Sequence, residues 1–262
     1  MPRRITIPVR SFGSEVGRPD VPELAEWLNR KRGTEVDLTT YQLERSLDAQ
    51  EGVTIPAAGG LFYSERLMEV FTGMKDGVLV DEPGVESAAA TADALFVRER
   101  CKDARIALPA PHILGLRDDY IGDREDFSET IADLYSRLIR EMRDQGVQGH
   151  VLIADTADLI EFERLAGRKV LFFPRDPARF DLELLLEYQD VLILPTTDLD
   201  RLADLMERFH VRKLVMLDPE EGEVVAASEI VDADSLEVGG YCADTAPGDY
   251  WKRLLGRAFI YR

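Results

Sequence analysis

The sequence predicts an α/β protein built as a single (β/α)8 barrel over residues 1–262. Short apolar segments rich in β-branched and aromatic residues recur eight times along the chain, and helical patterns separate them. These segments are apolar throughout rather than alternating, which is typical of parallel strands covered on both faces. Eight strand–helix units also fit a chain of 262 residues, since barrels of this kind take about 250.

An open, doubly wound parallel sheet is the alternative arrangement for such a pattern. Its usual GxGxxG fingerprint is absent after the first predicted strand, where the chain reads Arg10-Ser11-Phe12-Gly13-Ser14, and no Walker motif is present. We therefore expect the closed barrel. Its strands are predicted at residues 4–9, 53–55, 105–108, 150–154, 169–173, 191–194, 213–217 and 236–239.

The segments between these strands carry apolar residues at helical spacing. The clearest is 127–145, where Ile131, Leu138 and Met142 share one face and Gly146 follows as a stop signal. Further helices are predicted at residues 85–100, at 199–209 after an N-cap at 198, and from 37 or 39 to 49. No linker, internal repeat or low-complexity tract divides the chain, so we expect one domain.

The chain is acidic, with 50 Asp and Glu against 32 Lys and Arg and a net charge of -18. Such a surface repels phosphate backbones and anionic lipids, so we expect neither nucleic-acid nor membrane partners. Only six of the bases are lysine. This composition fits either a salt-adapted (halophilic) protein or a GC-rich genome, and we favour salt adaptation.

Cysteine use indicates a reducing compartment. Cys101 and Cys242 form neither a disulfide framework nor a CxxC pair. The first residues lack the apolar run of a signal peptide, and no apolar stretch is long enough to span a membrane. We expect a cytoplasmic protein.

In a (β/α)8 barrel the functional residues lie just past the C-terminal ends of the strands. On the predicted strands this rule selects polar side chains of both signs, which suit a small zwitterionic or anionic ligand. The candidates for substrate binding are Arg10, Ser11, Tyr63, Asp155 and Arg175. The catalytic candidates are Asp155, His112 and Cys242.

Several segments carry a resemblance in order and spacing. A helix ending Gln50-Glu51-Gly52 leads to Ala58-Gly59-Gly60, Ala107-Leu108-Pro109 precedes a long helix, Ile153-Ala154-Asp155 ends a strand, and Gly240-Tyr241-Cys242 precedes a last helix. Over most of the chain this resembles the C-terminal catalytic barrel of cobalamin-independent methionine synthase. The resemblance implies a methyltransferase barrel. The uroporphyrinogen decarboxylases share that barrel and remain a sibling alternative.

The chain departs from that family at its metal site. Family enzymes bind homocysteine as a thiolate on zinc, through an H-x-C pair after strand five, a glutamate after strand six and a cysteine after strand eight. Here the first two positions read Phe172-Phe173-Pro174 and Leu194-Pro195-Thr196, and only Cys242 remains. One ligand does not hold zinc, so we expect no metal, while a folate-type methyl donor stays a candidate.

Each candidate residue has two interpretations. By the resemblance Asp155 holds the substrate's amino group, and it equally suits a helix cap. His112 is a general base or a loop residue, and Cys242 is a nucleophile or a small apolar filler. Arg10 and Arg175 clamp a carboxylate or phosphate, or they form surface ion pairs.

Three functions follow. The first is a methionine synthase-like barrel without zinc that binds an amino-acid-like or folate-like small molecule, as a diverged methyltransferase or without turnover. The second is a non-catalytic partner or regulatory subunit of a methionine synthase-type enzyme. The third is a uroporphyrinogen decarboxylase-like enzyme in which Arg10, Arg175 and Asp155 act on a polycarboxylate.

Overall fold

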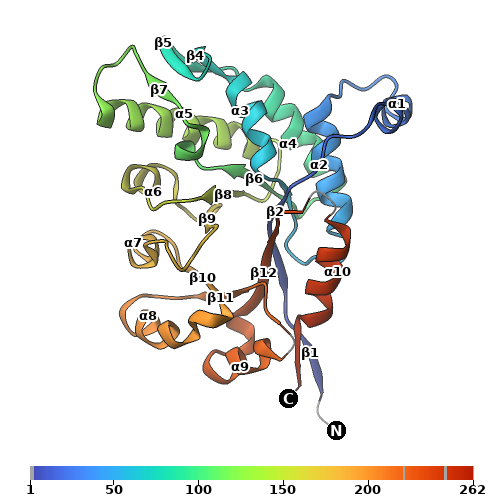
Figure 1. Ribbon diagram of the computed structural model, residues 1–262, viewed down its shortest axis with the longest axis vertical. Coiled ribbons are helices and arrows are strands. Elements are labelled where there is room, and N and C mark those ends of the chain that lie inside the picture. Colours follow the sequence, from blue (N-terminus) through green and yellow to red (C-terminus); the bar gives the residue numbers. More distant parts are fainter. Residues whose placement is uncertain (1–2, 221, 245–246, 262) are drawn as a thin grey trace.

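The computed structural model describes residues 3–220, 222–244 and 247–261 (Figure 1). Within them, eight parallel strands form an inner layer, and helices cover it from outside. In chain order the strands are β2 (Val9–Ser14), β3 (Ala57–Gly59), β6 (Arg105–Pro109), β8 (His150–Ala154), β9 (Val170–Pro174), β10 (Val191–Pro195), β11 (Lys213–Leu217) and β12 (Leu236–Cys242).

The helices between these strands supply the outer layer. They are α1 (Val21–Arg30), α2 (Leu38–Ala49), α3 (Ser64–Val70), α4 (Ala88–Arg100), α5 (Arg124–Asp144), α6 (Leu159–Leu165), α7 (Leu182–Leu186), α8 (Leu202–Arg208), α9 (Glu223–Ile230) and α10 (Gly248–Arg257). Short 3-10 turns are η1 (Leu61–Tyr63), η2 (Pro111–Leu114), η3 (Thr196–Arg201) and η4 (Ala233–Ser235). No helix in the described ranges is long and apolar enough to cross a membrane.

The eight strands belong to two four-stranded parallel sheets, in the orders β10-β11-β12-β2 and β3-β6-β8-β9. An isolated parallel bridge between Arg10 and Ile55 joins the two sheets on one side. There the Ser11 N–H donates to the Ile55 carbonyl at 2.9 Å. On the other side, the residues of β9 and β10 are not paired by a backbone ladder. The predicted closed barrel is therefore not seen: the ring is open in its hydrogen bonding along the β9–β10 seam.

Side chains that point into the ring form an inner core with residues from all strands but β12 in its buried set, among them Phe12, Ala107, Ile153, Phe173 and Val215. Side chains of the opposite parity pack against the helices in a larger outer core. Parallel strands covered on both faces need apolar residues on both, which explains the unbroken apolar runs of the sequence.

The first predicted strand is wrong in its bounds. Residues 4–6 form a separate strand, β1 (Arg4–Thr6), antiparallel to β13 (Phe259–Tyr261), and the barrel strand is the following segment, β2. All six residues of β2 are buried, including Ser11 and Ser14. The second strand is also displaced, from 53–55 to β3. The Gln50 side chain fixes β3 there, since it accepts from the Ala57 N–H and donates to the Ala57 carbonyl.

A β-hairpin was not predicted. It consists of β4 (Phe71–Lys75) and β5 (Val78–Val85), with β7 (Arg117–Asp118) parallel to β5. Its turn, Asp76-Gly77, has positive φ at both residues, 50° and 74°, and an Asp-Gly pair of this kind favours a two-residue hairpin turn. The helix predicted at 85–100 accordingly begins later, at Ala88, because residue 85 ends β5.

Candidate functional site

The C-terminal ends of the eight strands meet at one end of the ring, which we call the mouth. Its floor is aromatic: the rings of Phe12 and Phe173 stack in parallel with centroids 4.4 Å apart, and Tyr241 lies against Phe173 at 5.7 Å. Phe12 and Phe173 are almost fully buried. Aromatic side chains from β2, β9 and β12, rather than polar groups, therefore fill the inside of the barrel at the mouth.

An ion pair between neighbouring strand ends lies at the mouth. Asp155 follows β8 and Arg175 follows β9, and the guanidinium Nε and Nη2 donate to the two carboxylate oxygens at 2.5 and 2.8 Å. Each side chain is about two-fifths exposed, at 41% and 40%. The hydrogen bond to Asp155 raises the pKa of Arg175, and the charges of Asp155 and Glu15 act in the same direction.

A second polar pair lies at the mouth, between the ends of β12 and β2. The Tyr241 hydroxyl donates to the carboxylate of Glu15, which also accepts from the Leu61 N–H at 2.8 Å. Burial, followed by the neighbouring Glu15 charge, raises the pKa of Tyr241 far above its usual range, so the phenol keeps its proton. Glu15 directly follows β2, and the misplaced first strand concealed it at the sequence level.

His112 connects the loops after β6 and β8. Its Nδ1 lies 2.9 Å from Glu161, and its Nε2 accepts from the backbone N–H of Asp155 at 3.1 Å. Glu161 raises the pKa of His112 against the opposing effect of burial, while acceptance at Nε2 favours the neutral ring with its proton on Nδ1. Both nitrogens are therefore engaged: Nδ1 by Glu161 and Nε2 by the backbone of Asp155. Asp158 caps α6 by accepting from the Glu161 N–H. This local pattern in the sequence does not indicate that the Glu161 side chain also contacts His112.

A cavity of about 510 Å³ opens beside this histidine. It lies between η2, β7 and the first turns of α5 and α6. Its polar lining carries both signs of charge, from His112, Arg117, Arg124, Asp158 and Glu161. Phe127 and Ile131 supply apolar wall. The mouth therefore has an adjoining space large enough for part of a small molecule.

Other sequence candidates lie away from the mouth. Arg10 is the second residue of β2, so it lies at the opposite end of the ring, where its Nε donates to Glu237 at 2.6 Å. Ser11 is fully buried and accepts from the Gly13 N–H at 3.0 Å. Tyr63 is fully buried in the outer core, and its hydroxyl donates to Asp93 at 3.0 Å.

Cys242 also faces outward. It belongs to the outer core with 1% of its surface exposed, and its Sγ lies 3.5 Å from the Asp244 carbonyl oxygen. Burial raises the pKa of its thiol, which opposes thiolate formation. The strand residue that faces the inner core at this point is Tyr241.

Two glycines, Gly59 and Gly60, lie at the end of β3 because neighbouring backbones approach closely there. Gly59 has φ of 105°, and a Cβ there would lie 2.3 Å from the Ala107 carbonyl oxygen. A Cβ on Gly60 would lie 2.6 Å from the Ser14 carbonyl oxygen. Side chains at either position would collide with β6 or β2, so neither position can carry an acid.

No protein-family model matches the sequence, and no curated protein matches it either. Solved structures do match. A B12-independent methionine synthase from Shewanella sp. W3-18-1, in complex with selenomethionine, superposes with a TM-score of 0.63 at 16% identity, over 97% of both chains. The chain has a methionine synthase-like fold. A putative vitamin-B12-independent methionine synthase from Listeria monocytogenes superposes with a TM-score of 0.61 at 18% identity, over 93% of both chains.

The side chains of this methionine synthase-like fold do not fit a zinc ion. Across the described ranges, no three His, Cys, Asp or Glu side chains lie close enough together to hold a metal. Cys242 points away from the mouth, and at the end of β9 the inward residue is Phe173, stacked on Phe12. A catalytic zinc site takes three or four ligands from Cys, His, Asp and Glu side chains, and the described residues of this mouth gather no such set.

Proposed function

We propose that the protein is a methionine synthase-like barrel that binds a small amino-acid-like ligand at its mouth without zinc. The observation that carries the proposal is the exposed ion pair between Asp155 and Arg175. An α-amino acid presents one ammonium and one carboxylate group. Asp155 is suited to the first and Arg175 to the second, because a guanidinium binds a carboxylate through two parallel hydrogen bonds.

Opening this ion pair costs little. Exposed pairs contribute about 0–1 kcal/mol to stability, so a ligand that supplies both charges can displace the internal partners. His112 fixes the backbone of Asp155 through its N–H, which keeps the carboxylate in position while its partner is exchanged. The site is thus prepared for binding before the ligand arrives.

The aromatic floor favours an apolar or sulfur-containing side chain. Phe173 and Tyr241 lie at the mouth with centroids 5.7 Å apart, and thioether sulfur makes favourable contacts with ring edges. The Shewanella protein was solved with selenomethionine bound. These two points support methionine and homocysteine as the first compounds to test. The cavity beside His112, with Arg117 and Arg124, suits the carboxylates of a folate-type methyl donor.

The test is calorimetric titration with methionine and homocysteine. We expect saturable binding that Asp155→Asn and Arg175→Met each weaken by about tenfold, since each removes one charge of the complementary pair. A matched control is available in the same loop, where Asp176 and Arg179 form an exposed pair at 3.5 Å. Asp176→Asn and Arg179→Met should leave binding unchanged. Equal binding by Asp155→Asn and wild type would refute the proposal.

A second candidate function is a non-catalytic partner of a methionine synthase-type enzyme. One observation favours it: His112 has both ring nitrogens engaged and Cys242 faces the outer core, so neither offers a free base or nucleophile at the mouth. Co-purification with a complete methionine synthase from the same cell tests it. The decarboxylase alternative required Arg10 beside Arg175 and Asp155, and Arg10 lies at the other end of the ring.

We further propose that the protein works in the cytoplasm as one domain. Cys101 and Cys242 are both free thiols, which supports a reducing compartment. The inner core, built from strands that span the chain from Phe12 to Val215, supports a single folding unit. A single cooperative transition in thermal unfolding would be expected from one domain.

A further inference from the structure

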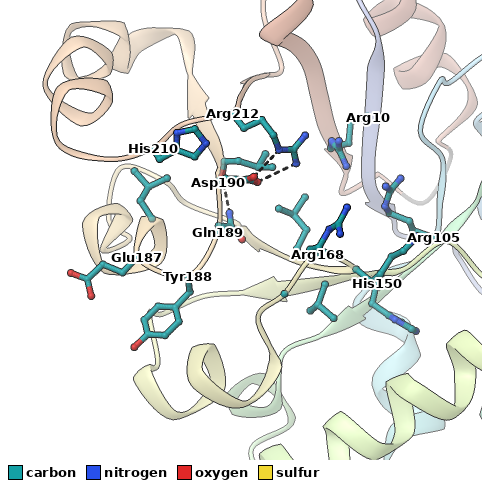
Figure 2. Close-up of a pocket in the computed structure, with 16 residues that line it drawn as sticks. Arg10, Arg105, His150, Arg168, Glu187, Tyr188, Gln189, Asp190, His210 and Arg212 are labelled. Atoms are coloured by element: carbon teal, nitrogen blue, oxygen red, sulfur yellow. Dashed lines mark hydrogen bonds and ion pairs between the residues drawn. The ribbon is translucent and has the colours of Figure 1, made fainter.

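A second cavity, of about 720 Å³, opens at the end of the ring opposite the mouth (Figure 2). It lies at the starts of β9 and β10, along the seam where these strands lack a ladder. Leu171 and Val191, from the inner faces of the two strands, form part of its wall. Nothing in the methionine synthase-like mouth uses this space.

The lining of this second cavity is cationic although the chain has a net charge of -18. Five basic side chains line it against two carboxylates. Figure 2 shows the guanidinium groups of four arginines around the same space. The basic residues are Arg10, Arg105, Arg168, Lys169 and Arg212, and the acids are Glu187 and Asp190. A protein that is acidic elsewhere has therefore collected positive charge here.

Two acidic groups at this end of the ring, Asp190 and Glu237, are already paired with arginines. Asp190 accepts from Arg212 through both oxygens, at 2.6 and 3.1 Å. Glu237, which is buried, accepts from the Nε of Arg10. Of the guanidinium nitrogens of Arg10, only the Nε is engaged in a hydrogen bond with another described residue.

Arg105 is a partly buried cation of this lining whose guanidinium has no carboxylate bonded to it among the described residues. It is the first residue of β6 and has the parity of Ala107, which lies in the inner core, so it points into the ring. It is partly buried, and its guanidinium makes no hydrogen bond or ion pair with another described residue, although its backbone N–H donates to the Pro56 carbonyl. Burial, followed by the charge of Arg10, lowers the pKa of Arg105 to about 10, and the nearby charge of Glu237 opposes this shift only in part. The guanidinium still carries its charge at neutral pH and faces a second guanidinium.

We propose that this second cavity binds a small dianionic ligand, either a phosphate ester or a dicarboxylate. Arg105 and Arg10 would contact the anion inside the ring, and Arg168 and Lys169 would contact it at the rim. Several guanidinium groups converging on one space recognise the oxygens of such anions by charge-assisted hydrogen bonds. A volume of about 720 Å³ lies in the range of small-molecule sites.

Arg105 should affect both the stability of the free protein and its binding of anions. An unpaired, partly buried cation destabilises the free protein, and it is retained where a ligand supplies the missing charge. Replacing Arg105 by methionine, which keeps the apolar stem, should therefore raise the melting temperature of the free protein and weaken its binding of anions. A residue with a purely structural role would not show both effects, because its loss would lower the melting temperature.

The experiment is titration calorimetry with glycerol 3-phosphate, inorganic phosphate and succinate, at constant ionic strength set with KCl. We expect at least one of the three to bind saturably. Arg105→Met should weaken that binding by about tenfold or more, and Arg168→Ala, at the exposed rim, by about threefold. The matched control is Arg137→Met, on the exposed face of α5, and it should bind as wild type does.

The probes also separate the two sources of the anion. Tighter binding of glycerol 3-phosphate than of succinate assigns the site to phosphate esters, and the reverse assigns it to dicarboxylates. The proposal is overturned if none of the three binds below about 20 mM, or if both Arg105→Met and Arg168→Ala bind within about twofold of wild type. Should Arg105→Met fail to fold, the rim variant alone decides between these outcomes.

Discussion

The Gln189 side chain takes the place of a strand partner for Phe172. Its Oε1 accepts from the Phe172 N–H at 3.0 Å, and its Nε2 donates to the Phe172 carbonyl at 3.3 Å and to the Val191 carbonyl at 2.8 Å. One amide thus spans the seam between β9 and β10, where the two sheets would otherwise leave backbone groups unpaired.

Gln189→Leu should loosen this seam. The substitution leaves the Phe172 N–H and carbonyl without their partner, so we expect a loss of about 1–3 kcal/mol in unfolding free energy. Denaturant titration measures the loss, and hydrogen exchange should show faster exchange at the Phe172 amide. Gln148→Leu is the control, because that glutamine makes one exposed bond to the Lys102 carbonyl. Equal stability of the two variants would show that the amide does not hold the seam.

His150 should make the protein acid-sensitive. Its ring is fully buried, neither nitrogen has a hydrogen-bond partner in the described ranges, and burial lowers its pKa to about 3. The unfolded chain takes up this proton below about pH 6.5, while the folded chain does not. The contribution of His150 to stability is therefore complete above that pH and is lost as pH falls from 6.5 toward 3.

The measurement compares His150→Leu with wild type across this pH range. At pH 5 the wild type should have lost about 2 kcal/mol through this residue, and the variant should not show that loss. His210→Leu, at an exposed position, serves as the control and should follow the wild-type curve. Parallel curves for wild type and His150→Leu would contradict the prediction.

Zinc analysis tests the altered mouth. Protein purified without chelator should contain less than about 0.1 equivalent of zinc, because Cys242 is turned away from the mouth and a single thiolate does not hold the ion. Cys242→Ser should contain no less than wild type. A full equivalent that disappears in Cys242→Ser would mean that the cysteine turns inward to coordinate metal.

Salt should stabilise the protein if its acidity is an adaptation. With a net charge of -18, repulsion within the surface is screened as the Debye length falls from about 10 Å at 0.1 M to about 3 Å at 1 M salt. We expect the melting temperature to rise by about 10 °C between these KCl concentrations. A change of less than about 2 °C would favour genome composition as the origin of the charge.

Apolar strands and amphipathic helices could be predicted because their signal is local. The segment 150–154 was assigned with the bounds that β8 has, and 213–217 with those of β11. The barrel strand β2 was missed because two of its buried residues are serines. Ser14 is satisfied by Trp251 Nε1 at 3.0 Å, a partner 237 residues away, and no local pattern announces such a bond.

The same limit applies to the mouth. Asp155 and Arg175 each follow a neighbouring parallel strand, so the topology alone brings them together once the strands are assigned. The contacts of Glu15 with Tyr241 and of His112 with Glu161 depend on loop paths and side-chain rotamers. The prediction of a closed ring was wrong for a related reason. The Gln189 side chain takes the place of a backbone ladder between β9 and β10.

The last residue of β3 limits which groups this part of the mouth can carry. An acid at position 59 would bring a Cβ within 2.3 Å of the Ala107 carbonyl oxygen, in a backbone conformation that favours glycine. A carboxylate cannot be placed at this position while β3 and β6 keep this spacing. Substitutions that change what the mouth binds must therefore occur on other strands.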